Sequence, residues 1–168
     1  PDVAKAFLHD LPDDVTVSID ASALVLDAQQ RLDLLQVAAS CHVFVANRVE
    51  LTTVMNPRGA QPVTVGQDSD VPASVKSSLE ESVDEMISQT GFGGVLVVKD
   101  GSNGAHAVHD GAWLHVPARD VVVVDTTGAG DAFTAGFLAE WTSSPTPAAS
   151  RMTDEALIGA LEAGTDLA

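Results

Sequence analysis

The sequence contains a single cysteine, few basic residues and no long hydrophobic run, and each shortage excludes a class of protein. Cys41 alone cannot form a disulfide framework or a cysteine-built metal cluster. No apolar stretch approaches the roughly 20 residues that a helix needs to cross a bilayer. The first fourteen residues do not have the basic head and apolar core of a signal peptide. We therefore expect an intracellular, cytoplasmic protein.

Basic residues number only 8 against 24 acidic ones, which gives a formal net charge of −16. Proteins that bind nucleic acid or anionic membranes normally carry the opposite sign, so neither partner is expected. The acid excess fits either a surface suited to a salty cytoplasm or an acidic protein from a high-GC organism, and the sequence does not separate the two. Hydrophobic residues make up 45% of the 168, which predicts a folded domain with a core of its own.

Strand-like and helix-like stretches alternate along the chain. Apolar runs predict strands over 15–20, 42–46, 93–99 and 121–125. Amphipathic stretches predict helices over 28–40, 47–55 and 74–89, one after 128 and one from Thr153. On the helix over 28–40, the expected apolar face consists of Leu32, Leu35, Val37 and Ala39. The segments 105–110 and 112–117, separated by Gly111, predict an antiparallel hairpin, and 56–72 reads as a loop. This alternation predicts an α/β fold with a mostly parallel sheet flanked by helices.

The most informative stretch is a glycine turn between the strand over 121–125 and the helix that follows it. Gly128, Ala129 and Gly130 make this turn, and their small size lets backbone N–H groups bind an anion at the helix N-terminus. Asp131 follows in the first helical turn, where a carboxylate beside an anion is unfavourable unless it accepts a proton. The arrangement suits phosphoryl transfer, with Asp131 as the base and the glycine turn as the anion site. The alternative is that Asp131 only caps the helix.

The segment around this turn, DTTGAGDAFTAGFL, closely resembles the C-terminal signature of the ribokinase-like sugar kinases, the PfkB carbohydrate kinase family. The match includes Asp125, the glycine turn, Asp131 and the small pair Ala135 and Gly136. The resemblance implies a ribokinase-like fold and an ATP-dependent kinase that phosphorylates a hydroxyl of a sugar or sugar acid, of the ribokinase, fructokinase or 2-keto-3-deoxygluconate kinase type. It also implies that Asp125 and Thr127 lie beside a monovalent cation such as K⁺, which some members of the family use.

Two further segments match the family in the same order. Asn47 and Glu50, after the strand over 42–46, resemble its Asn-x-x-Glu motif, which implies that they hold Mg²⁺ through water near the nucleotide phosphates. Taken alone, the same pair reads as a helix cap and a solvated charge. The segment 96–108 resembles the nucleotide-side glycine turn, with Gly101 and Gly104 in place and Lys99 where threonine is common. Its alternative is a plain β-turn.

The resemblance covers the C-terminal, nucleotide-binding part of the family's domain and leaves out the sugar-binding part and the lid. We therefore expect residues 1–168 to be a fragment, incomplete at both ends, of a kinase that forms a homodimer through its lid. A non-catalytic nucleotide-binding or interaction module of the same fold, and a nucleoside or vitamin kinase, stay open as alternatives. The histidines at 106, 109 and 115 alternate along the predicted hairpin; exposed strand histidines are expected there rather than a zinc cluster.

Overall fold

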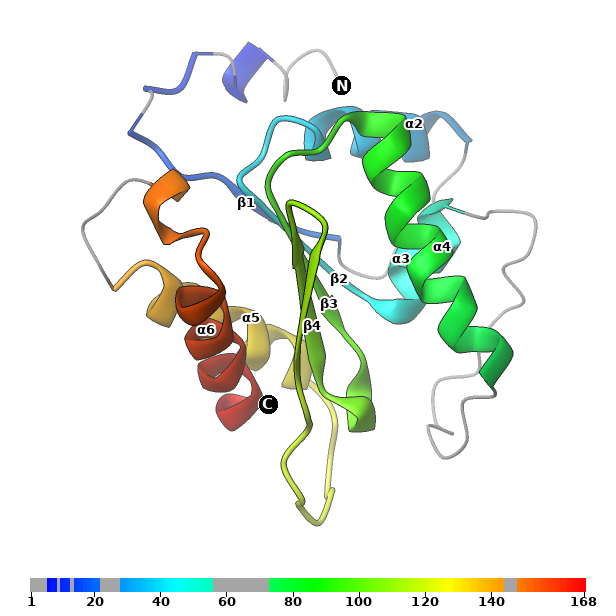
Figure 1. The fold of residues 1–168 in the computed structure, drawn as a ribbon, viewed down its shortest axis with the longest axis vertical. Helices are drawn as coiled ribbons and strands as arrows, with labels where there is room; N and C mark the ends of the chain where they lie inside the picture. Colours follow the sequence, from blue (N-terminus) through cyan, green and yellow to red (C-terminus); the bar gives the residue numbers. More distant parts are fainter. Residues whose placement is uncertain (1–5, 9, 13, 22–27, 56–72, 144–147) are drawn as a thin grey trace. The chain divides into compact units, whose positions relative to one another are not determined.

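The computed structural model describes residues 6–8, 10–12, 14–21, 28–55, 73–143 and 148–168. The chain divides into two compact units, Pro1–Gly94 and Val95–Ala168, which are described in turn (Figure 1). The expected loop over 56–72 lies outside the described residues. No described helix is both long and apolar enough to cross a membrane.

The first unit contains a parallel strand pair and, besides a helical turn at residues 6–8, the helices α2 (Ala28–Ala38), α3 (Arg48–Met55) and α4 (Ala73–Thr90). Strands β1 (Ser18–Asp20) and β2 (Val43–Asn47) pair in parallel, with Ile19 opposite Phe44. Strand β2 is buried along four of its five residues, as expected for a continuous apolar run between covered faces. All these elements agree in type with the sequence-based prediction.

The core of the first unit forms where α3 and α4 pack beside β2. Phe44, Leu51, Val83 and Met86 are completely buried in it. The predicted apolar face of α2 is wrong in part, because Leu32 is 45% exposed and Ala39 is also exposed. The residues of α2 that are buried are Leu35 and Ala38, three positions apart. The buried face of α2 is therefore narrower than the apolar face that its hydropathy pattern predicts.

Cys41 is a buried apolar residue of the first unit. Its thiol donates a hydrogen bond to the carbonyl of Ala38 at 3.1 Å, and burial raises its pKa from 9.0 to about 12. The folded state thus favours the protonated thiol. Its contribution to the stability of the fold is complete below the pKa of the unfolded chain and is lost as the pH rises from about 9 towards 12.

We expect Cys41 to react with a thiol reagent at pH 8 at least about 100-fold more slowly in the folded than in the urea-unfolded protein. Mass spectrometry of the Cys41 peptide measures this, and equal rates would contradict the burial.

The second unit is built on an antiparallel three-stranded arrangement. Strand β3 (Val95–Lys99) pairs with β4 (Ala105–His109), which pairs with β5 (Ala112–Val116). A 3-10 turn, η1 (Gly101–Asn103), joins β3 to β4, and a tight turn at Asp110 and Gly111 joins β4 to β5. The antiparallel hairpin of β4 and β5 was predicted, whereas the antiparallel pairing of β3 with β4 was not. The pairing of the described strands is therefore mixed rather than mostly parallel.

Helices α5 (Ala129–Trp141) and α6 (Asp154–Leu167) lie side by side in the second unit, and α6 also contacts β4 and β5 (Figure 1). Their close approach depends on small residues. A Cβ built on Gly136 would lie 2.6 Å from the carbonyl oxygen of Ala163, and one on Gly164 would lie 2.9 Å from that of Phe133. The small residue at 136 is thus required by the α5–α6 contact. A further 3-10 turn, η2 (Ala148–Arg151), precedes α6.

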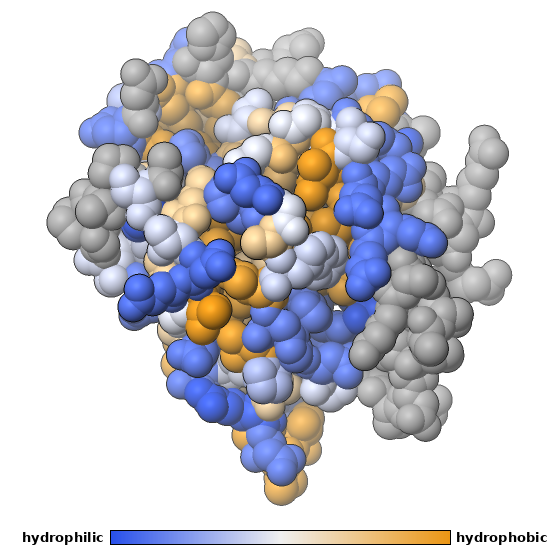
Figure 2. All heavy atoms as spheres, in the orientation of Figure 1, coloured by the Kyte–Doolittle hydropathy of each residue, from blue (hydrophilic) through white to orange (hydrophobic). Residues whose placement is uncertain are grey.

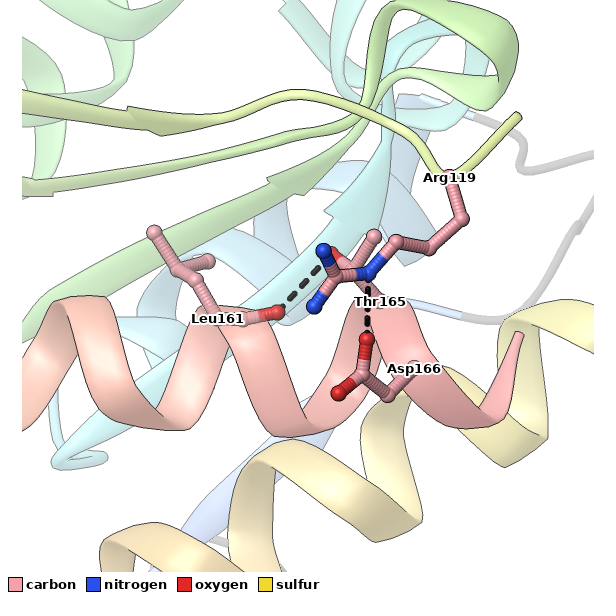
Figure 3. A network of polar contacts seen from close by, with 4 residues as sticks. All are labelled: Arg119, Leu161, Thr165 and Asp166. Atoms are coloured by element: carbon pink, nitrogen blue, oxygen red, sulfur yellow. Dashed lines mark hydrogen bonds and ion pairs between the residues drawn. The ribbon is translucent and has the colours of Figure 1, made fainter.

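An ion pair fastens the segment after β5 to the C-terminal end of α6. Figure 3 shows the guanidinium of Arg119 directed at Asp166, to which its Nε donates a hydrogen bond. This bond and the charge of Asp166 raise the pKa of Arg119. One residue earlier on α6, the hydroxyl of Thr165 donates to the carbonyl of Leu161 at 2.8 Å. The chain is therefore held to α6 just before it enters 121–125.

The predicted strand over 121–125 is not present as a strand. Val121 to Val124 are 65–93% exposed, and none of the strands described in the structure pairs with them. Figure 2 shows hydrophobic atoms at the lowest point of its view, where Figure 1 draws the segment between β5 and α5. Four consecutive valines have high strand propensity, but a strand also needs a hydrogen-bonded neighbour. The residue composition predicts the strand propensity but not whether a neighbouring strand is available for hydrogen bonding.

Candidate functional site

The glycine turn before α5 has the geometry of an anion site. Gly128 adopts a left-handed conformation (φ 81°), which residues with a side chain rarely adopt, and as the N-cap it offers no side-chain hydrogen bond. Helix α5 begins at Ala129, so Gly130 and Asp131 lie in its first turn. The first N–H groups of a helix have no partner within the helix and carry partial positive charge. The N–H of Ala129 donates to the carbonyl of Thr126 at 3.1 Å, so the N–H groups that this turn could offer to an external acceptor are those that follow Ala129 in the first turn of α5.

Asp131 lies at this turn with its side chain exposed to solvent. A carboxylate there is attracted by the helix dipole and can also receive a proton from a hydroxyl brought to the turn. Asp131 and the glycine turn therefore lie together at the start of α5, as their sequence positions predict. What the arrangement can do chemically is deprotonate an alcohol beside a bound phosphate.

Asp125 and Thr127 form a small turn of their own just before the glycines. The backbone N–H of Thr127 donates to Asp125 Oδ1 at 2.8 Å. This bond, together with further hydrogen bonds from Thr127 and Thr126, lowers the pKa of Asp125. The carboxylate is therefore charged throughout the neutral range. The hydrogen bonds to it weaken only as the pH falls through its lowered pKa, where it becomes protonated. An ionised carboxylate is thus held beside the glycine turn.

Lys99, the last residue of β3, reaches the same glycine turn. Its ammonium lies 3.4 Å from the hydroxyl of Thr134, which in turn donates to the carbonyl of Gly130 at 3.0 Å. A Cβ built on Gly130 would lie 3.5 Å from Lys99 Nζ, so the lysine side chain passes directly over the turn. Sequence reasoning missed Thr134, although its position four residues after Gly130 places it on the same helix face. Lys99, Gly130 and Thr134 are brought together from positions 31 to 35 residues apart in sequence.

Gly101 and Gly104 enclose the turn between β3 and β4. Gly104 donates its N–H to the carbonyl of Gly101 at 2.9 Å, and Asp100 donates its own to the carbonyl of Gly104 at 2.8 Å. On β5, the ring of His115 hydrogen-bonds through Nε2 to the carbonyl of Asn103 at 2.8 Å. Both glycines therefore belong to one closed turn that a neighbouring strand supports.

Asn47 and Glu50 lie together at the start of α3 in the first unit. Asn47 Oδ1 accepts from the N–H of Glu50 at 2.8 Å, and Glu50 Oε2 accepts from the N–H of Asn47 at 2.7 Å. This reciprocal pair is a capping box, so the capping interpretation of the two residues is confirmed. The box also holds two hard oxygen donors, one of them charged, together at one helix end.

The three hairpin histidines are not all exposed, contrary to expectation. His106 and His109 are part-buried, with side chains 20% and 16% exposed, and face Asp100 at 3.8 Å and Asp110 at 3.4 Å. The ring of His106 also stacks on that of His115 with centroids 4.6 Å apart. Among the described residues, no group of three or more His, Cys, Asp or Glu is placed to hold a metal ion. The histidines therefore pack and pair along the hairpin.

Comparison with known proteins gives a match over almost the whole chain. The model of the pfkB family carbohydrate kinases matches residues 18–165. A fructokinase of Klebsiella pneumoniae is 58% identical over 45 residues, 27% of this chain and 15% of that protein. An ATP-dependent ribose-1-phosphate kinase of Halopiger xanaduensis is 55% identical over 49 residues, 28% of this chain and 16% of that protein. A fructokinase of Salmonella thompson is 30% identical over 121 residues, 72% of this chain and 51% of that protein.

Solved structures of sugar and nucleoside kinases share the fold. The fructokinase of Vibrio cholerae O395 with fructose, ADP and calcium has a TM-score of 0.64 at 19% identity, over 89% of this chain and 42% of that one. The aminoimidazole riboside kinase of Salmonella enterica, with its riboside and an ATP analog, has a TM-score of 0.62 at 22% identity, over 90% and 44%. The chain thus spans less than half of these structures, and the predicted ribokinase-like α/β fold is confirmed.

Proposed function

The chain belongs to the pfkB family of carbohydrate kinases, and from that premise we propose that it is the C-terminal, nucleotide-binding part of an ATP-dependent kinase for a sugar, sugar acid or nucleoside. The observation that carries this proposal is the glycine turn at Gly128–Gly130, which has no side-chain cap at Gly128 and leads directly into Asp131 in the first turn of α5. In the proposed reaction, Asp131 takes the proton of the acceptor hydroxyl. The N–H groups of the turn stabilise the charge on the phosphoryl group as it passes from ATP to the acceptor oxygen.

The acceptor class is proposed from the relatives. Their names include fructokinase, ribose-1-phosphate kinase and aminoimidazole riboside kinase, and each of these names gives a sugar, a sugar phosphate or a riboside as the acceptor. We test the proposal by measuring ADP release by the full-length gene product with Mg-ATP and a panel of these sugars, nucleosides and keto-deoxy sugar acids. Turnover on one acceptor would support the kinase. Nucleotide binding without turnover on any acceptor would instead support a non-catalytic module of the same fold.

The residues of the first unit fit a magnesium site. Asn47 and Glu50 offer an amide oxygen and a carboxylate, hard donors of the kind that Mg²⁺ prefers, and they would hold the ion through its water shell. Bound there, Mg²⁺ would neutralise charge on the nucleotide phosphates. In the same way, the ionised Asp125 and the turn at Thr127 fit a monovalent cation such as K⁺, which would support the glycine turn.

Glu50→Gln isolates the metal role of Glu50 from its structural role. Glutamine retains the oxygen that closes the capping box but removes the negative charge. We expect the free Mg²⁺ concentration for half-maximal ADP release to rise at least about tenfold, with little change in the melting temperature. Glu81→Gln, at an exposed position of α4, is the matched control and leaves the Mg²⁺ dependence unchanged. An unaltered Mg²⁺ dependence in Glu50→Gln would leave the pair with a capping role alone.

A further inference from the structure

The η1 turn between β3 and β4 is exposed and contains few residues that could define its shape. Gly101, Ser102 and Asn103 are all exposed to solvent, and Gly101 and Gly104 have positive φ values of 54° and 92°. Glycine loses more backbone entropy on ordering than any other residue. Within the turn, backbone hydrogen bonds join Asn103 to Asp100 and Gly104 to Gly101. Contacts from outside the turn therefore add directly to its order.

Two histidines of the β4–β5 hairpin supply such contacts, one at each end of the turn. His106 and His115 are opposite each other in the register of the hairpin, and their rings stack with centroids 4.6 Å apart. His106 Nε2 lies 3.8 Å from Oδ2 of Asp100, whose side chain is 5% exposed. His115 Nε2 hydrogen-bonds to the carbonyl of Asn103 at 2.8 Å. This pair of histidines, here called the histidine clamp, therefore contacts η1 on both sides.

The chemistry of the acceptor defines what His115 does in the clamp. A carbonyl oxygen can only accept, so Nε2 of His115 carries a hydrogen and donates it to Asn103. The stacked ring of His106 holds the donating ring in its plane, and the indole of Trp113 meets His106 edge-on with centroids 6.0 Å apart. Cross-strand ring pairs of this kind stabilise a hairpin. The hairpin thus fixes the direction of the hydrogen bond to the turn.

We propose that the histidine clamp positions the η1 turn for the nucleotide, with His115 as the donor to the turn and His106 as the residue that orients it. This inference rests on the proposed function and on the likeness of segment 96–108 to the nucleotide-side turn of the family. Both histidines act through the turn and neither touches the nucleotide or the acceptor. A turn that is ordered beforehand costs less entropy on binding, so the clamp raises nucleotide affinity without taking part in phosphoryl transfer.

Two variants with side chains of equal length test the hydrogen bond of His115. In His115→Gln the side-chain amide can donate to the carbonyl of Asn103 as Nε2 does, whereas His115→Met has no donor. In the full-length gene product, we expect His115→Met to weaken AMP binding about 3–10-fold, the size of one lost hydrogen bond, and His115→Gln to stay within about twofold of the wild type. In His115→Met the KM for ATP rises in the same proportion, while kcat and the KM for the acceptor change less than about twofold.

Hydrogen exchange measures the order of the turn itself, in the absence of nucleotide. The N–H groups of Asn103 and Gly104 close the turn, and we expect them to exchange at least about threefold faster in His115→Met than in the wild type. His109→Met is the control, because it removes a third histidine of the hairpin, whose Nε2 faces Asp110 at 3.4 Å. This control leaves AMP binding and the exchange of the turn unchanged.

Unchanged AMP binding in His115→Met would overturn the proposal, and so would equal losses in His115→Met and His115→Gln, since the hydrogen bond would then have no effect. A parallel loss of kcat and of affinity for the acceptor would also overturn it, because the cause would be a disturbed domain. A wild-type protein that turns over ATP but binds no AMP contradicts the proposal alone. If the wild type binds AMP but phosphorylates no acceptor, the proposed function fails, while the binding and exchange comparisons still decide the role of the clamp.

Discussion

Asp131→Asn is expected to leave nucleotide binding nearly normal while turnover falls at least about a hundredfold, the lower end of what a general base contributes. Asparagine has the same size as aspartate and fits the same first-turn position of α5, so the glycine turn keeps its shape. Its amide cannot accept the proton of the acceptor hydroxyl. Steady-state ADP release measures the loss in kcat, and calorimetry with an ATP analogue measures the binding.

The chain offers a matched control for this variant. Asp154 is also an exposed aspartate in the first turn of a helix, α6, and Thr153 caps that helix through a bond from the N–H of Ala156 at 3.3 Å. Asp154→Asn removes the same charge from an equivalent helix position, so it carries the same loss of dipole interaction. We expect its turnover to equal that of the wild type. If both variants lose activity alike, or if Asp131→Asn loses almost none, Asp131 is not the base.

Elements whose signal is local could be predicted from the sequence. The continuous apolar run of β3 and the two strands separated by Gly111 have the expected type and extend within two residues of the predicted bounds. Each depends on burial or on turn chemistry that neighbouring residues specify. The predicted strand over 121–125 is wrong for the same reason, because its formation would depend on a partner strand far away in the chain.

The candidate site divides in the same way. Asp131 and the glycine turn are contiguous in sequence, so one motif was sufficient to find them, and the capping box of Asn47 and Glu50 follows from their spacing of three. The contact of Lys99 with Gly130 and Thr134 joins the end of β3 to the start of α5. That contact arises from tertiary packing, and the hydropathy pattern of neither segment predicts it.

Gly104→Ala is expected to destabilise the protein by at least about 3 kcal/mol, because it combines backbone strain with a backbone collision. Gly104 has φ 92° and ψ −139°, a region that is open essentially to glycine alone. A Cβ at this position would collide with the carbonyl oxygen of Val116 and would lie 2.7 Å from the nitrogen of Ala118. Neither atom belongs to a side chain that could rotate away, so the η1 turn and the end of β5 must separate.

Gly111→Ala provides the comparison, since Gly111 also has a positive φ (78°) but nothing lies within 4 Å of a Cβ built there. Its cost is the left-handed backbone alone, about 1–2 kcal/mol. Urea unfolding of the two variants therefore separates strain from collision. Because the collision displaces the turn that contains Gly101, Gly104→Ala should also weaken binding of AMP, whereas Gly111→Ala should not. Equal stabilities of the two variants would mean that the η1 turn and β5 do not approach as closely as the structure has them.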